Sequence, residues 1–299
     1  MSSDTSLSSL DEPQLRPQRQ TRRRRGVPRI RPDFFQTLNE NHFKKRFRFS
    51  KESVRCIFRK VQRSIPRARI KRSDCISPML QLLIALRFFG TGSFQAVIGD
   101  TANVSKATVC RVIERVTTAI VLLRPQYVYM PIPQQRPSVA SRFHDIAGFP
   151  RVIGAVDCTH IKINSPGRNR AELYRNRKED IGYPCLRYLM TPFLNPNTAA
   201  QEAYNKAQIS TRNTIERCFG VLERRFSCLY SGMQLKLKKV LKVIVACVVL
   251  HNMALDLDDC IIDDDELANE DVIEADPQQQ LDQNVAVRSS LVQQYFSNV

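Results

Sequence analysis

The 299-residue sequence has no tryptophan, no Cys-x-x-Cys pair and no long apolar run. Its longest apolar stretch, Val243 to Leu250, has eight residues, whereas a membrane-spanning helix needs about 20. The nine cysteines are odd in number and scattered, which argues against a disulfide scaffold and a zinc site. The N-terminal stretch MSSDTSLSSLDEPQ lacks the apolar segment of a secretory signal. We therefore expect a soluble protein with reduced thiols and no membrane partner.

Acidic residues are scarce outside the C-terminal end. The chain has 46 Lys and Arg against 29 Asp and Glu, a formal net charge of +17. Twelve of the acidic residues lie from Asp256 onward beside a single basic one, so this end carries −11 and the preceding residues carry +28. A body so basic favours a polyanionic partner, most commonly nucleic acid. Residues 256–299 are predicted to be an acidic disordered tail.

The first 123 residues are predicted to be a basic tail followed by helices. Residues 1–30 are rich in Ser, Pro, Gln and Arg, a composition typical of disorder. Four arginines there suit nuclear import or contact with phosphate, and the alternative is a solvated tail. These arginines are Arg22, Arg23, Arg24 and Arg25. Over residues 31–123 apolar positions recur at helical spacing. One helix is expected to start at Ser50 and end before Pro66, and another to run from about Pro78 to Phe89.

A helix-turn-helix is predicted next. A short helix over about 93–99 and a turn near 100–104 precede a longer helix that Ser105 caps. The longer helix should bury the stripe Val109, Val112, Ile113, Val116 and Ile120. The residues expected to reach DNA bases or phosphates are Ser105, Lys106, Thr108, Arg111 and Arg115. The alternative is an ordinary helical hairpin with a basic outer face.

The composition changes after residue 123. Five prolines within 124–150 predict a linker without regular structure. Residues 151–163 resemble a buried central strand that contains one carboxylate, Asp157, and a buried carboxylate is costly unless it is paired or holds a metal. Helices are expected over about 211–230 and 238–255. The first of these carries Glu216 among the arginines Arg212, Arg217 and Arg224.

Three carboxylates stand out by their context: Asp157, Asp180 before a Gly-Tyr-Pro turn, and Glu216. Such a set suits two-metal phosphodiester chemistry, in which carboxylates hold two divalent cations about 3.5 to 4 Å apart. Oxygen ligands of this kind select Mg²⁺ or Mn²⁺. The alternative is that these are surface or capping carboxylates, because a chain with 29 acidic residues offers many such triples.

Six segments carry a family resemblance, in the order GAVDCTHIKI, NRK, DIGYP, LMTPFLNP, NTIERCFGVLERRF and CVVLHNMA. In these segments the chain resembles Harbinger-type transposases and the nucleases derived from them, over roughly residues 43–255. The resemblance implies a nuclear, divalent-metal-dependent DNA endonuclease, with the cytoplasm as a further location, that often works with a Myb-like partner protein. It places a DDE triad and metal ligands at Asp157, Asp180 and Glu216, and phosphate contacts at Arg212, Arg217 and Arg224.

The expected fold class is therefore α/β: an all-helical, helix-turn-helix-like region followed by an RNase H-like core over 151–255. That core should be incomplete. Only 23 residues separate Asp157 from Asp180, whereas the two further strands and crossover helix of an RNase H-like core need about 40. We expect impaired nuclease activity in consequence. The alternatives are a non-catalytic DNA-binding protein using residues 44–123, and a scaffold whose acidic tail covers the basic body. The sequence indicates neither a DNA target nor an oligomeric state.

Overall fold

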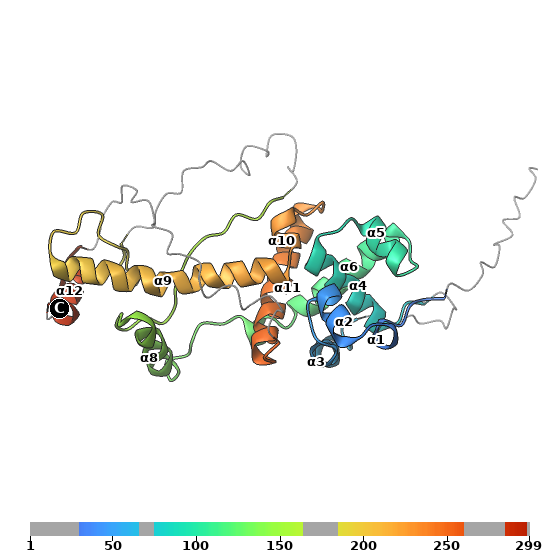
Figure 1. The fold of residues 1–299 in the computed structure, drawn as a ribbon, viewed down its shortest axis with the longest axis horizontal. Helices are drawn as coiled ribbons and strands as arrows, with labels where there is room; N and C mark the ends of the chain where they lie inside the picture. The colour runs from blue at the N-terminus through green and yellow to red at the C-terminus, as the bar shows by residue number, and fades with distance from the viewer. Residues whose placement is uncertain (1–29, 66–74, 164–184, 260–284, 298–299) are drawn as a thin grey trace, which may run out of the picture.

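The computed structural model describes residues 30–65, 75–163, 185–259 and 285–297. These residues are predominantly helical, and Figure 1 shows two groups of helices joined by one long helix. The helices are α1 (Phe34–Thr37), α2 (Glu40–Phe47), α3 (Lys51–Val61), α4 (Pro78–Thr91), α5 (Gln95–Thr101), α6 (Lys106–Val121), α7 (Arg124–Tyr127), α8 (Arg136–Ala147), α9 (Ala199–Arg225), α10 (Cys228–Ser231), α11 (Leu237–Asp256) and α12 (Val285–Tyr295).

Local capping signals fix where the N-terminal helices begin. The side chains of Ser50, Ser77 and Ser105 each accept a hydrogen bond from the backbone N–H three residues on, which satisfies a donor that the first helical turn leaves unpaired. α4 ends at Gly92, whose φ of 62° is a left-handed conformation that glycine adopts without steric cost. The predicted helix starts near Ser50, Pro78 and Ser105 are therefore confirmed.

One hydrophobic core joins the N-terminal helices to the C-terminal part of the chain. α4 lies at its centre and packs against α2, α5, α6 and α10, while α11 packs against α6 and α7. The predicted α6 stripe is buried, with Val109 and Val116 at 0% exposure. The same cluster continues from Leu222 in α9 to Ala254 in α11. Residues 31–123 thus bury their apolar surface partly against helices more than a hundred residues later in the sequence.

A second, smaller cluster lies at the other end of α9, where α8 and α12 pack (Figure 1). Tyr204 is fully buried there, with ring centroids 5.2 Å from Phe149 and 5.7 Å from Phe296. The Arg288 guanidinium lies 3.9 Å from the Phe193 ring centroid. The expected disorder of 256–299 is therefore wrong for residues 256–259, where α11 ends and Asp259 is buried. It is also wrong for residues 285–297, because an apolar edge of α12 packs on this cluster. Residues 260–284 of the predicted tail lie outside the described residues.

Two helices occupy the proline-rich stretch 124–150. Pro125 and Pro137 lie in the first turns of α7 and α8, where a missing N–H costs nothing and the fixed φ of proline suits a helix. The expectation that these prolines exclude regular structure was wrong. α9 also starts at Ala199, well before the predicted 211, because Thr198 caps it by accepting a hydrogen bond from Gln201 N.

Residues 151–163 do not form the predicted buried strand. They are extended. Within the described part of the chain, their β-pairing consists of one isolated parallel bridge between Ile163 and Met233. A strand is stable only beside partner strands, and the described residues supply none here. Val156 is accordingly 54% exposed. The sheet that an RNase H-like core requires is thus not formed within the described ranges, and residues 164–184 lie outside them.

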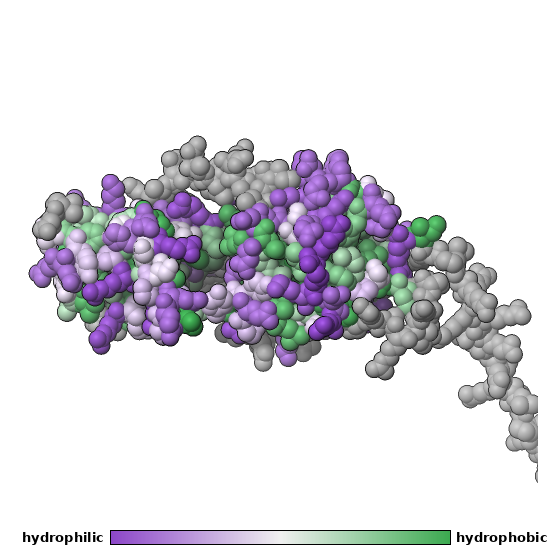
Figure 2. Space-filling view, turned by 90° about the horizontal axis from the view of Figure 1, so that it is seen from below, coloured by the Kyte–Doolittle hydropathy of each residue, from purple (hydrophilic) through white to green (hydrophobic). Residues whose placement is uncertain are grey.

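The surface mixes polar and apolar areas. On the face drawn in Figure 2, green hydrophobic areas are separated by purple hydrophilic ones. Among the described helices, none combines the length and apolar character that a bilayer crossing demands.

Candidate nuclease residues and nucleic-acid interface

The extended segment that carries Asp157 runs beside α9 from one end to the other. Phe149 packs on Tyr204 in the first turns of α9. Thr159 Oγ1 then donates a hydrogen bond to Glu223 Oε1 near its end (2.9 Å). Beyond α9, Met233 N donates to Lys162 O. In Figure 1 the yellow-green segment follows this course toward α10. Chain direction is therefore the same in the segment and the helix.

This course brings the first and third predicted catalytic carboxylates to a similar level along α9. Asp157 lies two residues before Thr159, which is at most about 7 Å of extended chain. Glu216 lies two helical turns before Glu223, about 10 Å. The Thr159–Glu223 hydrogen bond is thus the contact that relates the two segments that carry these carboxylates. Asp180, the predicted second carboxylate, lies outside the described residues.

Around these two carboxylates, the residues that the structure describes do not form a metal centre. Asp157 Oδ1 accepts a hydrogen bond from the adjacent Cys158 N at 2.8 Å, and the residue is half-exposed rather than buried. Glu216 Oε1 forms an ion pair with Arg212 Nη2 at 2.6 Å. Within the described ranges no three His, Cys, Asp or Glu side chains group as metal ligands would. The described residues therefore do not fit the two divalent cations that the family implies.

The helix face around Glu216 is only partly enclosed. Leu222 and Phe226 are buried, but Ile215 and Phe219, which precede them at helical spacing, are only half-buried. An RNase H-like sheet would cover such a face. Of the arginines predicted to contact phosphate, Arg212 is engaged with Glu216, whereas Arg217 is exposed and Arg224 is half-buried.

The pair α5–α6 has a tight connecting turn. Val104 N donates a hydrogen bond to Gly99 O at 2.9 Å, and Asn103 has a left-handed φ of 53°. A Cβ on Gly99 would lie 2.6 Å from Val104 O, so the close approach of the two backbones requires glycine. The two helices and the short turn predicted here are therefore present, as α5 (Gln95–Thr101) and α6 (Lys106–Val121).

The predicted DNA-contacting residues of α6 divide into two groups. Ser105 Oγ lies 2.9 Å from Thr108 Oγ1, and Arg111 Nη2 donates to that same Thr108 oxygen at 3.4 Å. The two hydroxyls therefore hold the first turn of the helix together. Lys106, Arg111 and Arg115 are exposed and carry positive charge to the surface. The other predicted contacts, Arg22, Arg23, Arg24 and Arg25, lie outside the described residues.

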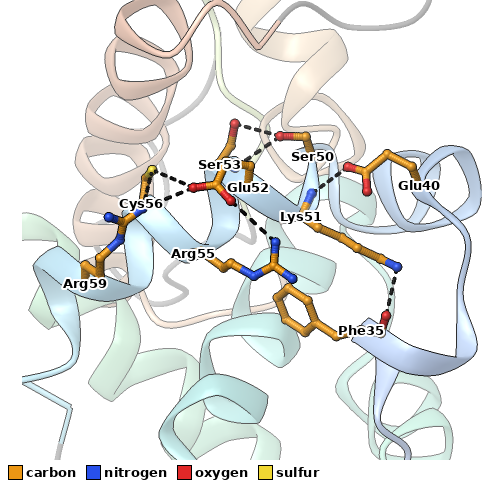
Figure 3. A network of polar contacts seen from close by, with 9 residues as sticks. All are labelled: Phe35, Glu40, Ser50, Lys51, Glu52, Ser53, Arg55, Cys56 and Arg59. Carbon is orange, nitrogen blue, oxygen red and sulfur yellow. Dashed lines mark hydrogen bonds and ion pairs between the residues drawn. The ribbon is translucent and has the colours of Figure 1, made fainter.

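The outer face of α3 is basic but partly neutralised (Figure 3). Glu52 accepts hydrogen bonds from Arg55 Nη1 at 3.4 Å and from Arg59 Nη2 at 3.1 Å. The Arg55 guanidinium also lies 5.2 Å from the ring centroid of Phe35. Lys51 Nζ points the other way and donates to the carbonyls of Phe35 and Leu38, at the end of α1. These contacts hold the α1–α3 corner together and neutralise part of the positive charge of α3.

Three charged residues that the sequence analysis did not expect to be buried are interior: Arg288, on the α12 cluster, and the pair Arg225 and Asp259. Arg225, 2% exposed, donates to the backbone carbonyls of Arg48 and Asp259 and lies over the Phe49 ring. Asp259, 5% exposed, accepts a hydrogen bond from Ser50 N at 2.8 Å and ion-pairs with Lys44 Nζ at 3.1 Å. Burial opposes ionisation, but the hydrogen bonds from Ser53 and Ser50 and the Lys44 charge outweigh it and lower the pKa of Asp259.

Comparison with known proteins defines the class to which these residues belong. Residues 179–252 match the DDE superfamily endonuclease family, so this part of the chain is a DDE endonuclease domain. The mouse protein named "Putative nuclease HARBI1" is 31% identical over 245 residues, a match covering 62% of this chain and 70% of the mouse protein.

The human HARBI1 is 30% identical with the same coverage. Protein ALP1-like of Arabidopsis thaliana is 22% identical over 260 residues, covering 64% of each chain. The chain thus belongs to the Harbinger-derived family that HARBI1 represents, which confirms the predicted family. No solved structure matches the chain significantly.

Proposed function

We propose that this chain is a Harbinger-derived, DNA-binding protein whose nuclease centre is not assembled. The observation that carries the proposal is the environment of the two described triad residues. Glu216 is neutralised by Arg212 at 2.6 Å, and Asp157 sits in an extended, half-exposed segment that has one isolated bridge. A catalytic metal ligand must be held within about 0.5 Å of its proper place by a rigid frame, and here the frame would be the sheet.

The comparisons support the absence of part of that frame. The match to mouse HARBI1 runs over 245 residues, yet 62% of 299 residues is about 185. Within the matched region, about 60 positions of the mouse protein therefore have no counterpart in this chain. The endonuclease family match begins at residue 179, within the Asp157–Asp180 interval where the sequence analysis expects strands to be missing. A deletion in this interval would account for both findings.

DNA binding is proposed for the basic helical region. Lys106, Arg111 and Arg115 project from α6, which follows the tight turn after α5, and the chain before Asp256 carries a charge of +28. Basic side chains on the second helix of such a pair suit entry into the major groove. The N-terminal arginine run suits a nuclear location, and a Myb-like partner is proposed from the family resemblance alone.

The test of lost catalysis uses the purified full chain with supercoiled plasmid DNA and Mg²⁺ or Mn²⁺. We expect no nicking above the level of the Asp157→Asn variant, measured by gel electrophoresis. Asp145→Asn serves as the matched control because Asp145 is an exposed carboxylate on α8. Cleavage that Asp157→Asn abolishes and Asp145→Asn retains would overturn the proposal.

The test of DNA binding uses the same chain and a labelled duplex, with the dissociation constant measured by fluorescence anisotropy over a range of KCl concentrations. Because each phosphate contact releases a counterion, log affinity should fall linearly with log salt concentration, with a slope of about −0.9 per contact. Arg111→Ala should make this slope shallower by about one contact. A chain that does not bind the duplex at low salt contradicts the proposed function.

A further inference from the structure

The start of α11 adds lysines to the edge of α6. The sequence LKLKKVLK places four lysines within seven residues, at positions 236, 238, 239 and 242. Two of them, Lys239 and Lys242, line a small hollow between α11 and α6 together with Cys110, Glu114 and Thr117 of α6. The two helices also pack on each other through the main core. Residues 125 positions apart in the sequence thus share one surface.

Both lysines are electrostatically coupled to α6. Lys239 Nζ forms an ion pair with Glu114 Oε2 at 2.9 Å. The hydrogen bond from Lys239 and the positive charges of Lys239 and Lys242 lower the pKa of Glu114. Lys239 Nζ also lies 3.9 Å from Cys110 Sγ. Glu114 is the acidic residue on the exposed face of α6, so this pair removes the repulsion that a phosphate would meet there.

The exposed cations of α6 continue from this edge. Arg111 lies one turn before Glu114 on the same face, and Arg115 follows it. The surface therefore runs from Lys242 and Lys239 of α11, across Glu114, to Arg111 and Arg115. Apart from Glu114, which Lys239 neutralises, each named side chain along it is positive.

We infer that Lys239 and Lys242 form a second row of DNA-phosphate contacts beside α6. This inference rests on the proposed DNA-binding function. Packed helices lie about 8 to 10 Å apart, and the major groove is about 12 Å wide. When α6 lies in the groove, its packed neighbour α11 therefore lies over the sugar–phosphate backbone. A lysine side chain of α11 can then reach a phosphate. The DNA surface is then built from both the helical region and the endonuclease domain.

Contacts of this kind position a protein on the duplex without reading sequence. Removing them should weaken binding to all duplexes alike. Lys242→Ala should reduce the salt slope by about 0.9, which is one phosphate contact. Lys239→Ala combined with Glu114→Gln should do the same, because the double change removes the lysine without exposing an unpaired carboxylate. Glu114→Gln alone should leave the slope intact and tighten binding, because it removes a negative charge from the surface.

The experiment measures affinity against KCl concentration for the full-length variants and a labelled duplex of mixed sequence. Lys206→Ala is the matched control, an exposed lysine in the N-terminal half of α9. Circular dichroism verifies that each variant keeps its helical content. If the wild type does not bind, the proposed function fails. If the wild type binds and Arg111→Ala lowers the slope while both α11 variants match Lys206→Ala, only this inference fails.

Discussion

Arg225 Nη1, at the end of α9, donates a hydrogen bond to the backbone carbonyl of Arg48, which lies 177 positions earlier, across 2.8 Å. Because the other arm of the same guanidinium binds the Asp259 carbonyl, one side chain ties three distant segments together. The Asp259 carboxylate in turn accepts a hydrogen bond from the backbone N–H of Ser50, the cap of α3. These buried hydrogen bonds hold the endonuclease domain against the N-terminal helices.

Replacing Arg225 should destabilise the chain. Arg225→Ala leaves two buried carbonyls without their donor and opens a cavity beside Phe49, so we expect a loss of about 2 to 4 kcal/mol in the free energy of unfolding. Arg225→Lys should lose less, since it keeps the charge but not the two-armed geometry. Urea denaturation measures the effect. Arg217→Ala, an exposed arginine of the same helix, is the control and should change stability little. Equal stability of Arg225→Ala and Arg217→Ala would contradict this account.

Asp259 should make stability depend on pH. Its pKa is lowered below the ordinary 3.8 in the folded chain. The unfolded state therefore binds more protons in the acid range. The stabilising contribution is complete above the unfolded pKa and is lost as pH falls through the lowered folded pKa. At neutral pH, Asp259→Asn should cost about 1 to 3 kcal/mol.

The difference in the free energy of unfolding between wild type and Asp259→Asn should shrink as the pH is lowered from 5 toward 3. Denaturant midpoints measured across that range check this. A gap that stays constant with pH would show that the Asp259 carboxylate has an unshifted pKa in the folded chain.

The α5–α6 turn should not tolerate a side chain at Gly99. A Cβ there would lie 2.6 Å from Val104 O, a backbone atom that cannot move freely, so Gly99→Ala should cost about 1 to 3 kcal/mol. Gly220→Ala is the matched control. Gly220 lies within α9, where a Cβ would have no neighbour within 4 Å, so its replacement should stabilise by about 0.5 to 1 kcal/mol. Thermal unfolding followed by circular dichroism measures both. Opposite signs are expected, and equal signs would refute the tight-turn interpretation.

A fragment ending at Arg124 should not fold as a unit. Its apolar residues share one core with Val240, Val243 and Leu250 of α11, and removing α11 exposes the face of α6 that contacts it. We expect the fragment to show a broad, non-cooperative unfolding curve and rapid proteolysis, while the full chain unfolds cooperatively. A sharp transition for the fragment would indicate that the N-terminal helices are independent. In that case, the α6–α11 packing would contribute little to stability.

The sequence predicted those features that depend on nearby residues. A cap such as Ser105 acts on the turn that follows it, and the α6 stripe needs only a 3.6-residue period, so both were predictable. The strand over 151–163 was not, because a strand depends on partners elsewhere in the chain. The Arg212–Glu216 pair has the i, i+4 spacing that favours an ion pair, but the family resemblance pointed to separate roles for the two residues.

The buried hydrogen bonds of Arg225 and Asp259 could not be predicted for a related reason. Arg225 directly follows Arg224 on an arginine-rich helix, and Asp259 lies in the acidic stretch that starts at Asp256. Nothing local separates these two from their exposed neighbours. Only the packing of α9 and α11 onto the α2–α3 corner makes them interior residues. Charged residues inside charged runs are thus where sequence patterns are least informative.

The length of α9 sets a distance between the two ends of the molecule. Its 27 residues span about 40 Å at 1.5 Å per residue, slightly more than the 34 to 36 Å of one turn of duplex DNA. α10 and α11 pack near one end of this rod, and α8 and α12 pack near the other. α9 therefore separates the two hydrophobic clusters of the described residues by roughly the length of one turn of duplex DNA.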